Sequence, residues 1–108
     1  MKIYLAGKIT GDPDYREKFR SVEEKLTKRG FVVMTPATLP EHMTPADYMR
    51  ICFSMIDSAD AVFFLPDWID SAGARLERDY CCYIGKECMG VRKFMEYTEV
   101  APSDAQNF

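Results

Sequence analysis

Glu77 carries the strongest chemical signal in this sequence, because its place on a predicted helix is unusual for a carboxylate. The stretch at 70–77, DSAGARLE, follows a short apolar run at 61–65 and opens a helix. Placing helical residues about 100° apart puts Glu77 on the small, apolar side of this helix. The other members of that side are Gly73, Ala74, Tyr80, Cys81 and Ile84. Because an unpaired buried charge is costly, three interpretations follow: an ion pair with a nearby Lys or Arg, a helical pattern assigned slightly out of phase, or a functional carboxylate.

A second candidate feature is the short polar loop at residues 7–11, which follows a predicted strand at 2–6. Gly7 and Gly11 let the backbone approach a ligand closely and turn its N–H groups outward. The spacing matches neither the dinucleotide-binding fingerprint nor the P-loop, so the motif alone is weak. Its position is better evidence, because ligands of open α/β sheets bind at the carboxyl ends of the strands.

Four apolar segments alternate with three amphipathic ones, and these must position the candidate groups. We expect strands at 2–6, 31–34, 61–65 and 88–94, with a helix between each pair. This alternation predicts an α/β protein with a parallel sheet and right-handed crossovers: a three-layer, flavodoxin-like (Rossmann-like) fold with strand order 2-1-3-4. In that order the first and third strands are neighbours, so the loops at 7–11 and 66–71 meet with Glu77 behind them. This convergence favours a functional Glu77.

Start signals and apolar stripes define the first two helices. The first is expected to begin at Asp12–Pro13, with Asp as N-cap and Pro at the first helical position. The second is expected to begin with a near capping box at Thr44 and Asp47. Its inward stripe is predicted to be Tyr48, Ile51, Cys52 and Met55. Residues 35–43, between the second strand and this helix, are predicted to form a loop of the kind that serves as a lid or binding loop.

Composition limits the class of protein. With 108 residues, 47% of them hydrophobic and 29% charged, we expect one soluble domain at 1–96 and a C-terminal tail at 97–108. No stretch approaches the about 20 apolar residues of a membrane span, and residues 1–4 run directly into a strand. We therefore expect no membrane contact, no signal peptide and a cytoplasmic location. The net charge of −3, without a basic run, argues against a nucleic-acid polymer as partner but not against a single nucleotide.

The cysteines predict neither a metal site nor a disulfide framework. The four of them show no C-x-x-C spacing, and His42 is the sole histidine. We expect small buried apolar residues, with Cys82 as the exception, and no cofactor. A Cys–His nucleophile pair, in which His42 acts with Cys52 or Cys81, is an alternative without local support.

Three segments resemble the nucleoside 2-deoxyribosyltransferase superfamily, which includes the 2'-deoxynucleoside 5'-monophosphate N-hydrolases. These segments are residues 3–9 (IYLAGKI), 60–62 (DAV) and 71–77 (SAGARLE). The resemblance covers residues 2–93 apart from the loop at 35–43, and it is closest to small members of the group. It implies cleavage or transfer at the N-glycosidic bond of a small-molecule nucleoside or nucleotide. It also implies a homodimer or higher homo-oligomer.

The resemblance also implies roles for individual residues. Glu77 corresponds to the nucleophile of the family, and Tyr4 to a first-strand tyrosine near the sugar and the nucleophile. The phosphate-binding loop of the monophosphate hydrolases corresponds to Gly7, Lys8, Ile9 and Thr10. Their site serine corresponds to Ser71.

Other residues complete the implied substrate site or depart from the family. Asp70, or else Asp67, would protonate the leaving base. Trp68 would stack on the base or serve only in packing, and Gly73 lies within the substrate-binding motif. The family often has an Asp that helps to hold the sugar where this chain has Cys52.

A second departure concerns the phosphate loop. Thr10 stands where the monophosphate hydrolases place an Arg, and Lys8 is the cation that would compensate. Two further readings remain open from the sequence. One is a nucleotide-binding module without turnover, in which Glu77 only hydrogen-bonds a ribose and which Cys52 favours. The other is a structural α/β domain with a vestigial site.

Overall fold

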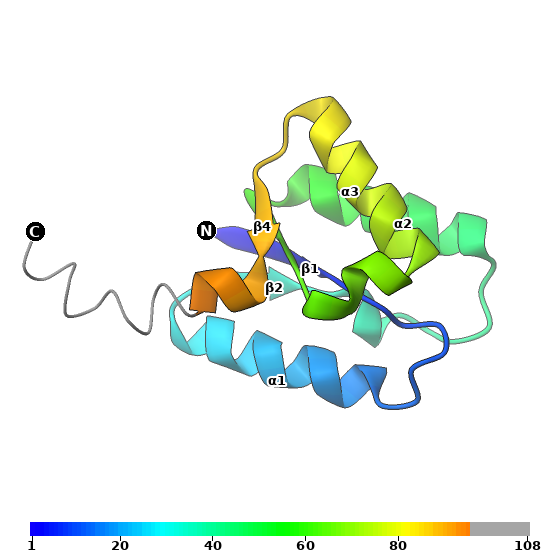
Figure 1. Ribbon diagram of the computed structural model, residues 1–108, viewed down its shortest axis with the longest axis horizontal. Helices are drawn as coiled ribbons and strands as arrows, with labels where there is room; N and C mark the ends of the chain where they lie inside the picture. Colours follow the sequence, from blue (N-terminus) through cyan, green and yellow to red (C-terminus); the bar gives the residue numbers. More distant parts are fainter. Residues whose placement is uncertain (96–108) are drawn as a thin grey trace, which may run out of the picture.

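Four parallel strands form the sheet in the order β2-β1-β3-β4 (Figure 1). The structure is a computed structural model that describes residues 1–95. The strands are β1 (Lys2–Ala6), β2 (Val32–Met34), β3 (Ala61–Phe64) and β4 (Cys88–Gly90). The predicted tail at 97–108 lies outside the described residues.

Helices cover both faces of this sheet. Figure 1 shows α1 (Tyr15–Lys28) on one side and α2 (Pro45–Ser58) and α3 (Ala72–Ile84) together on the other. Two short 3-10 helices, η1 (Pro36–Thr38) and η2 (Pro66–Asp70), precede α2 and α3. The arrangement confirms the predicted three-layer, flavodoxin-like α/β fold and its strand order. In the described part of the chain, no helix is both long and apolar enough to cross a bilayer.

Alternate residues of β1 face opposite helical layers. Ile3 and Leu5 belong to the core under α1, whereas Tyr4 and Ala6 belong to the core under α2 and α3. All four are fully buried. Burial on both faces is typical of a parallel strand between helices, and here it directs Tyr4 toward the layer that contains Glu77.

α1 begins later than the sequence predicts. Its first residue is Tyr15 rather than Pro13, and its N-cap, Asp14, makes no side-chain capping bond. Asp12 instead accepts a hydrogen bond from the Asp14 amide at 2.9 Å and a contact from Lys18 Nζ at 2.5 Å. The prediction was wrong because an ion pair with a residue further along the helix holds Asp12 in a turn.

α2 begins where the sequence predicts, with both hydrogen bonds of a capping box between Thr44 and Asp47. Its inward stripe is partly different, because Ile51 is 37% exposed and Ile56 is fully buried. Cys52 and Ile56 are four residues apart and share one helix face, so Ile51 points about 100° away from Cys52.

Three other predictions need correction near the ends of elements. β4 stops at Gly90 rather than Phe94, and residues 91–95 are helical. This agrees with the weakness of glycine in strands.

Ile84, predicted to lie on the apolar side of α3, is instead 42% exposed, because α3 ends there before the left-handed Gly85. The segment at 35–43 is not wholly irregular, since Thr35 Oγ1 caps η1 by accepting from the Ala37 amide.

Candidate functional site

Glu77 lies in the protein interior, where Tyr4 is its hydrogen-bond partner. It is 4% exposed, and its Oε2 accepts a hydrogen bond from the Tyr4 hydroxyl. Burial raises the pKa of Glu77 to about 7, although the bond from Tyr4 acts in the opposite direction. Within residues 1–95 Glu77 makes no ion pair with a Lys or Arg, so the structural ion pair considered from the sequence is not what the fold contains.

Cys52 completes a buried cluster with Tyr4 and Glu77. It lies on the inner side of α2, is 2% exposed and interacts with the Tyr4 hydroxyl. Burial raises the pKa of the Cys52 thiol to about 11, so the thiol is protonated near neutral pH. The cluster therefore contains one group, Glu77, that gains or loses charge in the physiological range.

The remaining cysteines do not form a site with the histidine. Cys81 is buried, Cys82 is exposed, and Cys88 is partly buried rather than buried as expected, because it lies on the edge strand β4. His42 is exposed in the loop before α2, and within residues 1–95 no hydrogen bond joins it to Cys52 or Cys81. In the same range, no group of His, Cys, Asp and Glu side chains could hold a metal ion.

An ionic cluster that the sequence did not predict holds the loop after β1. Lys18 Nζ lies 2.5 Å from Asp12 Oδ2 and 2.5 Å from Asp67 Oδ2. It also donates to the Lys8 carbonyl at 2.8 Å, and Asp67 Oδ1 accepts from the Lys8 amide at 3.1 Å. The cluster joins the β1–α1 loop, α1 and η2, so the loops at 7–11 and 66–71 are brought together as predicted.

The charge state of this cluster follows from its contacts. Partial burial opposes the positive charge of Lys18, but hydrogen bonds to Asp12 and Asp67 outweigh that effect and raise the pKa of Lys18. The hydrogen bond from Lys18 is also the main reason that the pKa of Asp12 lies below its ordinary value. The position of Asp67 just after a buried strand was the one feature of the sequence that indicated this ionic cluster. Lys18 gave no such indication, because it resembles the other charged residues on the solvent-exposed face of α1.

Packing against Leu65, rather than close approach of the backbone to a ligand, requires glycine at position 7. A Cβ atom at this position would lie 2.8 Å from Leu65 Cδ1 and 2.9 Å from Leu65 Cβ, closer than side chains approach. The next amide, of Lys8, points at Asp67 instead of outward as expected. Ile9 packs against the α1-side core, and Thr10 is exposed.

The start of α3 places the serine and glycine of the motif in structural roles. Ser71 is the N-cap, and its Oγ accepts from the Ala74 amide at 3.2 Å. Gly73 faces α2, where an added Cβ would lie 3.4 Å from Met49 Cε. Both residues therefore serve the start of α3 and its packing against α2.

Asp70 and Trp68 lie on η2, beside this helix start. Asp70 is exposed, and in the described part of the chain no hydrogen bond links it to Glu77 or Tyr4. Trp68 is partly buried, with its ring centroid 5.6 Å from that of Phe64, in the core that includes Tyr4 and Cys52. The fold thus brings Trp68 near the Glu77 cluster and leaves Asp70 at the surface above it.

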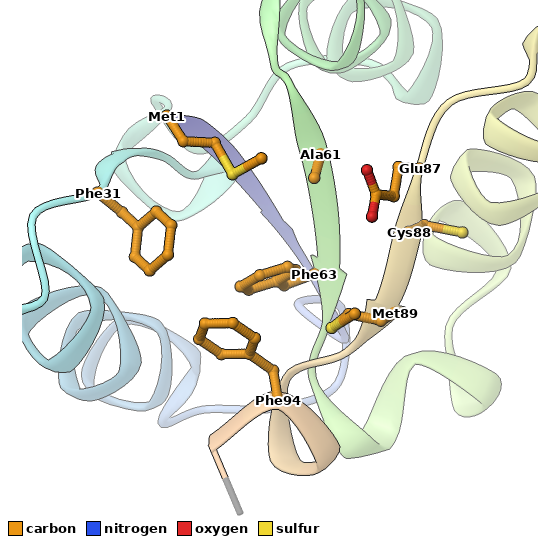
Figure 2. Close-up of a pocket in the computed structure, with 8 residues that line it drawn as sticks. All are labelled: Met1, Phe31, Ala61, Phe63, Glu87, Cys88, Met89 and Phe94. Carbon is orange, nitrogen blue, oxygen red and sulfur yellow. The ribbon is translucent and has the colours of Figure 1, made fainter. Parts of the chain in front are cut away.

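A small cavity lies elsewhere, on the α1 side of β3 and β4 (Figure 2). Its volume is about 120 Å³, and it is lined by Met1, Phe31, Ala61, Phe63, Glu87, Cys88, Met89 and Phe94. Figure 2 shows the rings of Phe31, Phe63 and Phe94 turned toward one another. It is smaller than the roughly 300–1,000 Å³ of most small-molecule sites, and none of the candidate residues lines it.

Comparison with known proteins shows the fold and one sequence family. No curated protein matches the sequence significantly. A 2-deoxyribosyltransferase from Leishmania mexicana superimposes with a TM-score of 0.67 at 19% identity, covering 82% of this chain and 62% of that one. A 2-deoxyribosyltransferase from Bacillus psychrosaccharolyticus superimposes with a TM-score of 0.59 at 24% identity, covering 82% and 70%.

The chain therefore spans less than two thirds of the Leishmania enzyme and shares its fold. The family model "Domain of unknown function (DUF4406)" matches residues 1–90. The chain belongs to the DUF4406 family, and its fold is that of the 2-deoxyribosyltransferases.

Proposed function

We propose that this protein breaks the N-glycosidic bond of a 2'-deoxynucleoside or its 5'-monophosphate, with Glu77 as the nucleophile. The observation that carries the proposal is the Glu77 carboxyl group, which is buried, hydrogen-bonded to Tyr4 and paired with no cation among residues 1–95. Such burial is costly, and perturbed carboxyl groups of this kind gather at functional sites. The fold shared with 2-deoxyribosyltransferases supports the substrate class.

The chemistry uses Glu77 in two steps. One carboxylate oxygen attacks C1' of the sugar while the bond from C1' to the base breaks and its electron pair leaves with the base nitrogen. The product is a glycosyl ester on Glu77, which divides one difficult step into two. Water or a second base then attacks C1', the ester bond breaks, the carboxylate returns, and the proton that the attacking group loses passes to the acid that had protonated the leaving base. Tyr4 orients the carboxylate throughout by donating to its other oxygen.

Asp70 is the better candidate for the acid that protonates the leaving base. Both oxygens of Asp67 already accept hydrogen bonds, one from the Lys8 amide and one from Lys18. Asp67 is therefore already engaged at both oxygens by groups of the protein. Asp70 is exposed at the end of η2, directly before the N-cap of the helix that carries Glu77.

The second candidate function is nucleotide binding without turnover. Two observations favour it: Cys52 supplies no charge next to Glu77, and Glu77 is only 4% exposed. In this case the carboxylate accepts a hydrogen bond from a sugar hydroxyl and forms no covalent bond.

One experiment separates the two functions. The protein is incubated with the common 2'-deoxynucleosides and their 5'-monophosphates, with and without a free acceptor base, and base release is followed by chromatography. Release that Glu77→Gln abolishes, together with a deoxyribosyl adduct seen by intact-mass spectrometry in the wild type, supports the enzyme. Glu24→Gln is the matched control, because Glu24 is exposed on α1 on the opposite face of the sheet. Thermal stabilisation by these ligands without base release supports the binding module, and no response to any of them contradicts both.

A further inference from the structure

The β1–α1 loop already holds an anion of its own, the carboxylate of Asp67. Asp67 Oδ1 accepts from the Lys8 amide at 3.1 Å, and Oδ2 lies 2.5 Å from Lys18 Nζ. A backbone amide after a strand, combined with an ammonium group, is a donor set with which proteins bind phosphate. In this chain the side chain of Asp67 occupies those donors.

One more amide near the loop is engaged by a carboxylate of the protein. The Asp14 amide at the start of α1 donates to Asp12 Oδ1 at 2.9 Å, and Asp12 Oδ2 is the second carboxylate partner of Lys18. One ammonium therefore faces two carboxylates, and the three side chains together carry a net negative charge. Lys8 adds a cation nearby, but its charge too acts on Asp12.

From this arrangement we infer that Asp67 determines the substrate class: the site takes a free nucleoside and rejects the 5'-monophosphate. The inference rests on the proposed function. The loop after β1 lies at the carboxyl edge of the sheet beside η2, which precedes the helix of Glu77, so we place the 5' end of a sugar bound at Glu77 against this loop. A phosphate there meets the like charge of Asp67 and finds the Lys8 amide and Lys18 already paired, which opposes binding. A 5'-hydroxyl is neutral and donates a hydrogen bond to a carboxylate, so Asp67 accommodates it.

The activity test compares each nucleoside with its own monophosphate. The wild type is expected to have a kcat/KM at least about tenfold higher for the free nucleoside, and Asp67→Asn is expected to reduce that ratio by about tenfold or more. Asparagine keeps an oxygen for the Lys8 amide, removes the charge and replaces the acceptor of Lys18 by an NH2 group, so Lys18 loses this partner. Glu24→Gln makes the same change in net charge on the outer surface of α1 and is expected to leave the ratio unchanged. A wild type that prefers the monophosphate, or a ratio that Asp67→Asn does not alter, overturns the inference.

A binding test separates this inference from the proposed function. Inorganic phosphate is titrated into the ¹⁵N-labelled protein while the amide signals of Lys8 and Asp14 are followed by NMR. We expect no saturable shift in the wild type and a saturable shift in Asp67→Asn. If no substrate releases its base but this pattern holds, the enzyme proposal fails and the role of Asp67 in excluding phosphate stands. Saturable binding of phosphate at the Lys8 amide of the wild type overturns that role whether or not the protein is an enzyme.

Discussion

Tyr4 and Glu77 are 73 residues apart in the sequence and share a buried hydrogen bond, in which the tyrosine hydroxyl donates to the carboxylate. The bond joins a buried residue of strand β1 to the buried face of helix α3. Burial raises the pKa of both groups, that of Glu77 to about 7 and that of Tyr4 well above its ordinary value. Tyr4 therefore remains a donor over the whole range in which Glu77 changes charge.

The first prediction concerns the pH dependence of activity. Because only the ionised Glu77 attacks C1', kcat/KM is expected to rise with pH through an apparent pKa of about 7. Tyr4→Phe removes a hydrogen bond that lowers this pKa, so the rise is expected to move to higher pH and activity at neutral pH to fall by about tenfold or more. Tyr83→Phe is the control, since Tyr83 is 92% exposed on the same helix as Glu77. Superimposable profiles for Tyr4→Phe and the wild type would contradict this role of Tyr4.

The second prediction concerns stability as a function of pH. The pKa of Glu77 is about 7 in the folded protein against 4.5 for an ordinary glutamate, so the folded state binds the proton more tightly. Protonated Glu77 stabilises the folded state fully at pH values below 4.5, the pKa of an ordinary glutamate. This stabilisation is lost as pH rises through about 7, the pKa of Glu77 in the folded protein.

Glu77→Gln abolishes this dependence because glutamine cannot ionise. The variant is expected to match the wild type under acidic conditions and to exceed its unfolding free energy by about 1–3 kcal/mol at alkaline pH. Urea unfolding at a series of pH values measures the difference, with Glu24→Gln as the control. A variant that is less stable than the wild type at alkaline pH would show that the charged carboxylate stabilises the fold.

The third prediction concerns the thiols. Burial raises the pKa of Cys52 to about 11 and that of Cys81 to about 12, and both residues are inaccessible, whereas Cys82 is exposed. Iodoacetamide is expected to alkylate Cys82 first in the native protein and Cys52 and Cys81 only on unfolding. Peptide mapping by mass spectrometry after timed exposure gives the order. Early modification of Cys52 would mean that the cluster around Glu77 opens readily to solvent.

The fourth prediction concerns the contact between the β1 loop and the end of β3. Gly7→Ala would place a Cβ atom 2.8 Å from Leu65 Cδ1, within a fully packed region. The variant is expected to lose about 1–3 kcal/mol of unfolding free energy. Gly90→Ala is the matched control, because a Cβ atom there meets nothing within 4 Å. Thermal unfolding of the two variants side by side tests the prediction, and equal midpoints would contradict it.

Local signals in the sequence were sufficient for much of the fold. Thr44 and Asp47 form the predicted capping box, and the uniformly apolar β3 is buried on both faces. The alternation of elements predicted a parallel sheet, and the flavodoxin-like order 2-1-3-4 expected for it, which the structure confirms, predicted that the β1 and β3 loops would meet. These features depend on neighbouring residues and on chain connectivity, both of which are present in a sequence.

Other features depend on partners that the short patterns do not include. Asp12, directly before a proline, has the form of an N-cap, yet Lys18 holds it in a turn before the helix and also pairs with Asp67. Gly7 has the form of a ligand-binding glycine, but its need for a small side chain comes from Leu65. A start signal or a glycine spacing contains neither Lys18 with Asp67 nor Leu65, so it predicts neither outcome.

Glu77 shows both kinds of determination. Helical periodicity alone predicted that this carboxylate faces the apolar side of its helix, and its burial confirms that placement. Only the tertiary structure decided what surrounds it: the hydroxyl of Tyr4, the protonated thiol of Cys52 and no cation within the described residues. The physical reason is that periodicity determines the direction of a side chain, whereas the pKa of a buried carboxyl group depends on the groups that packing brings to it from other elements.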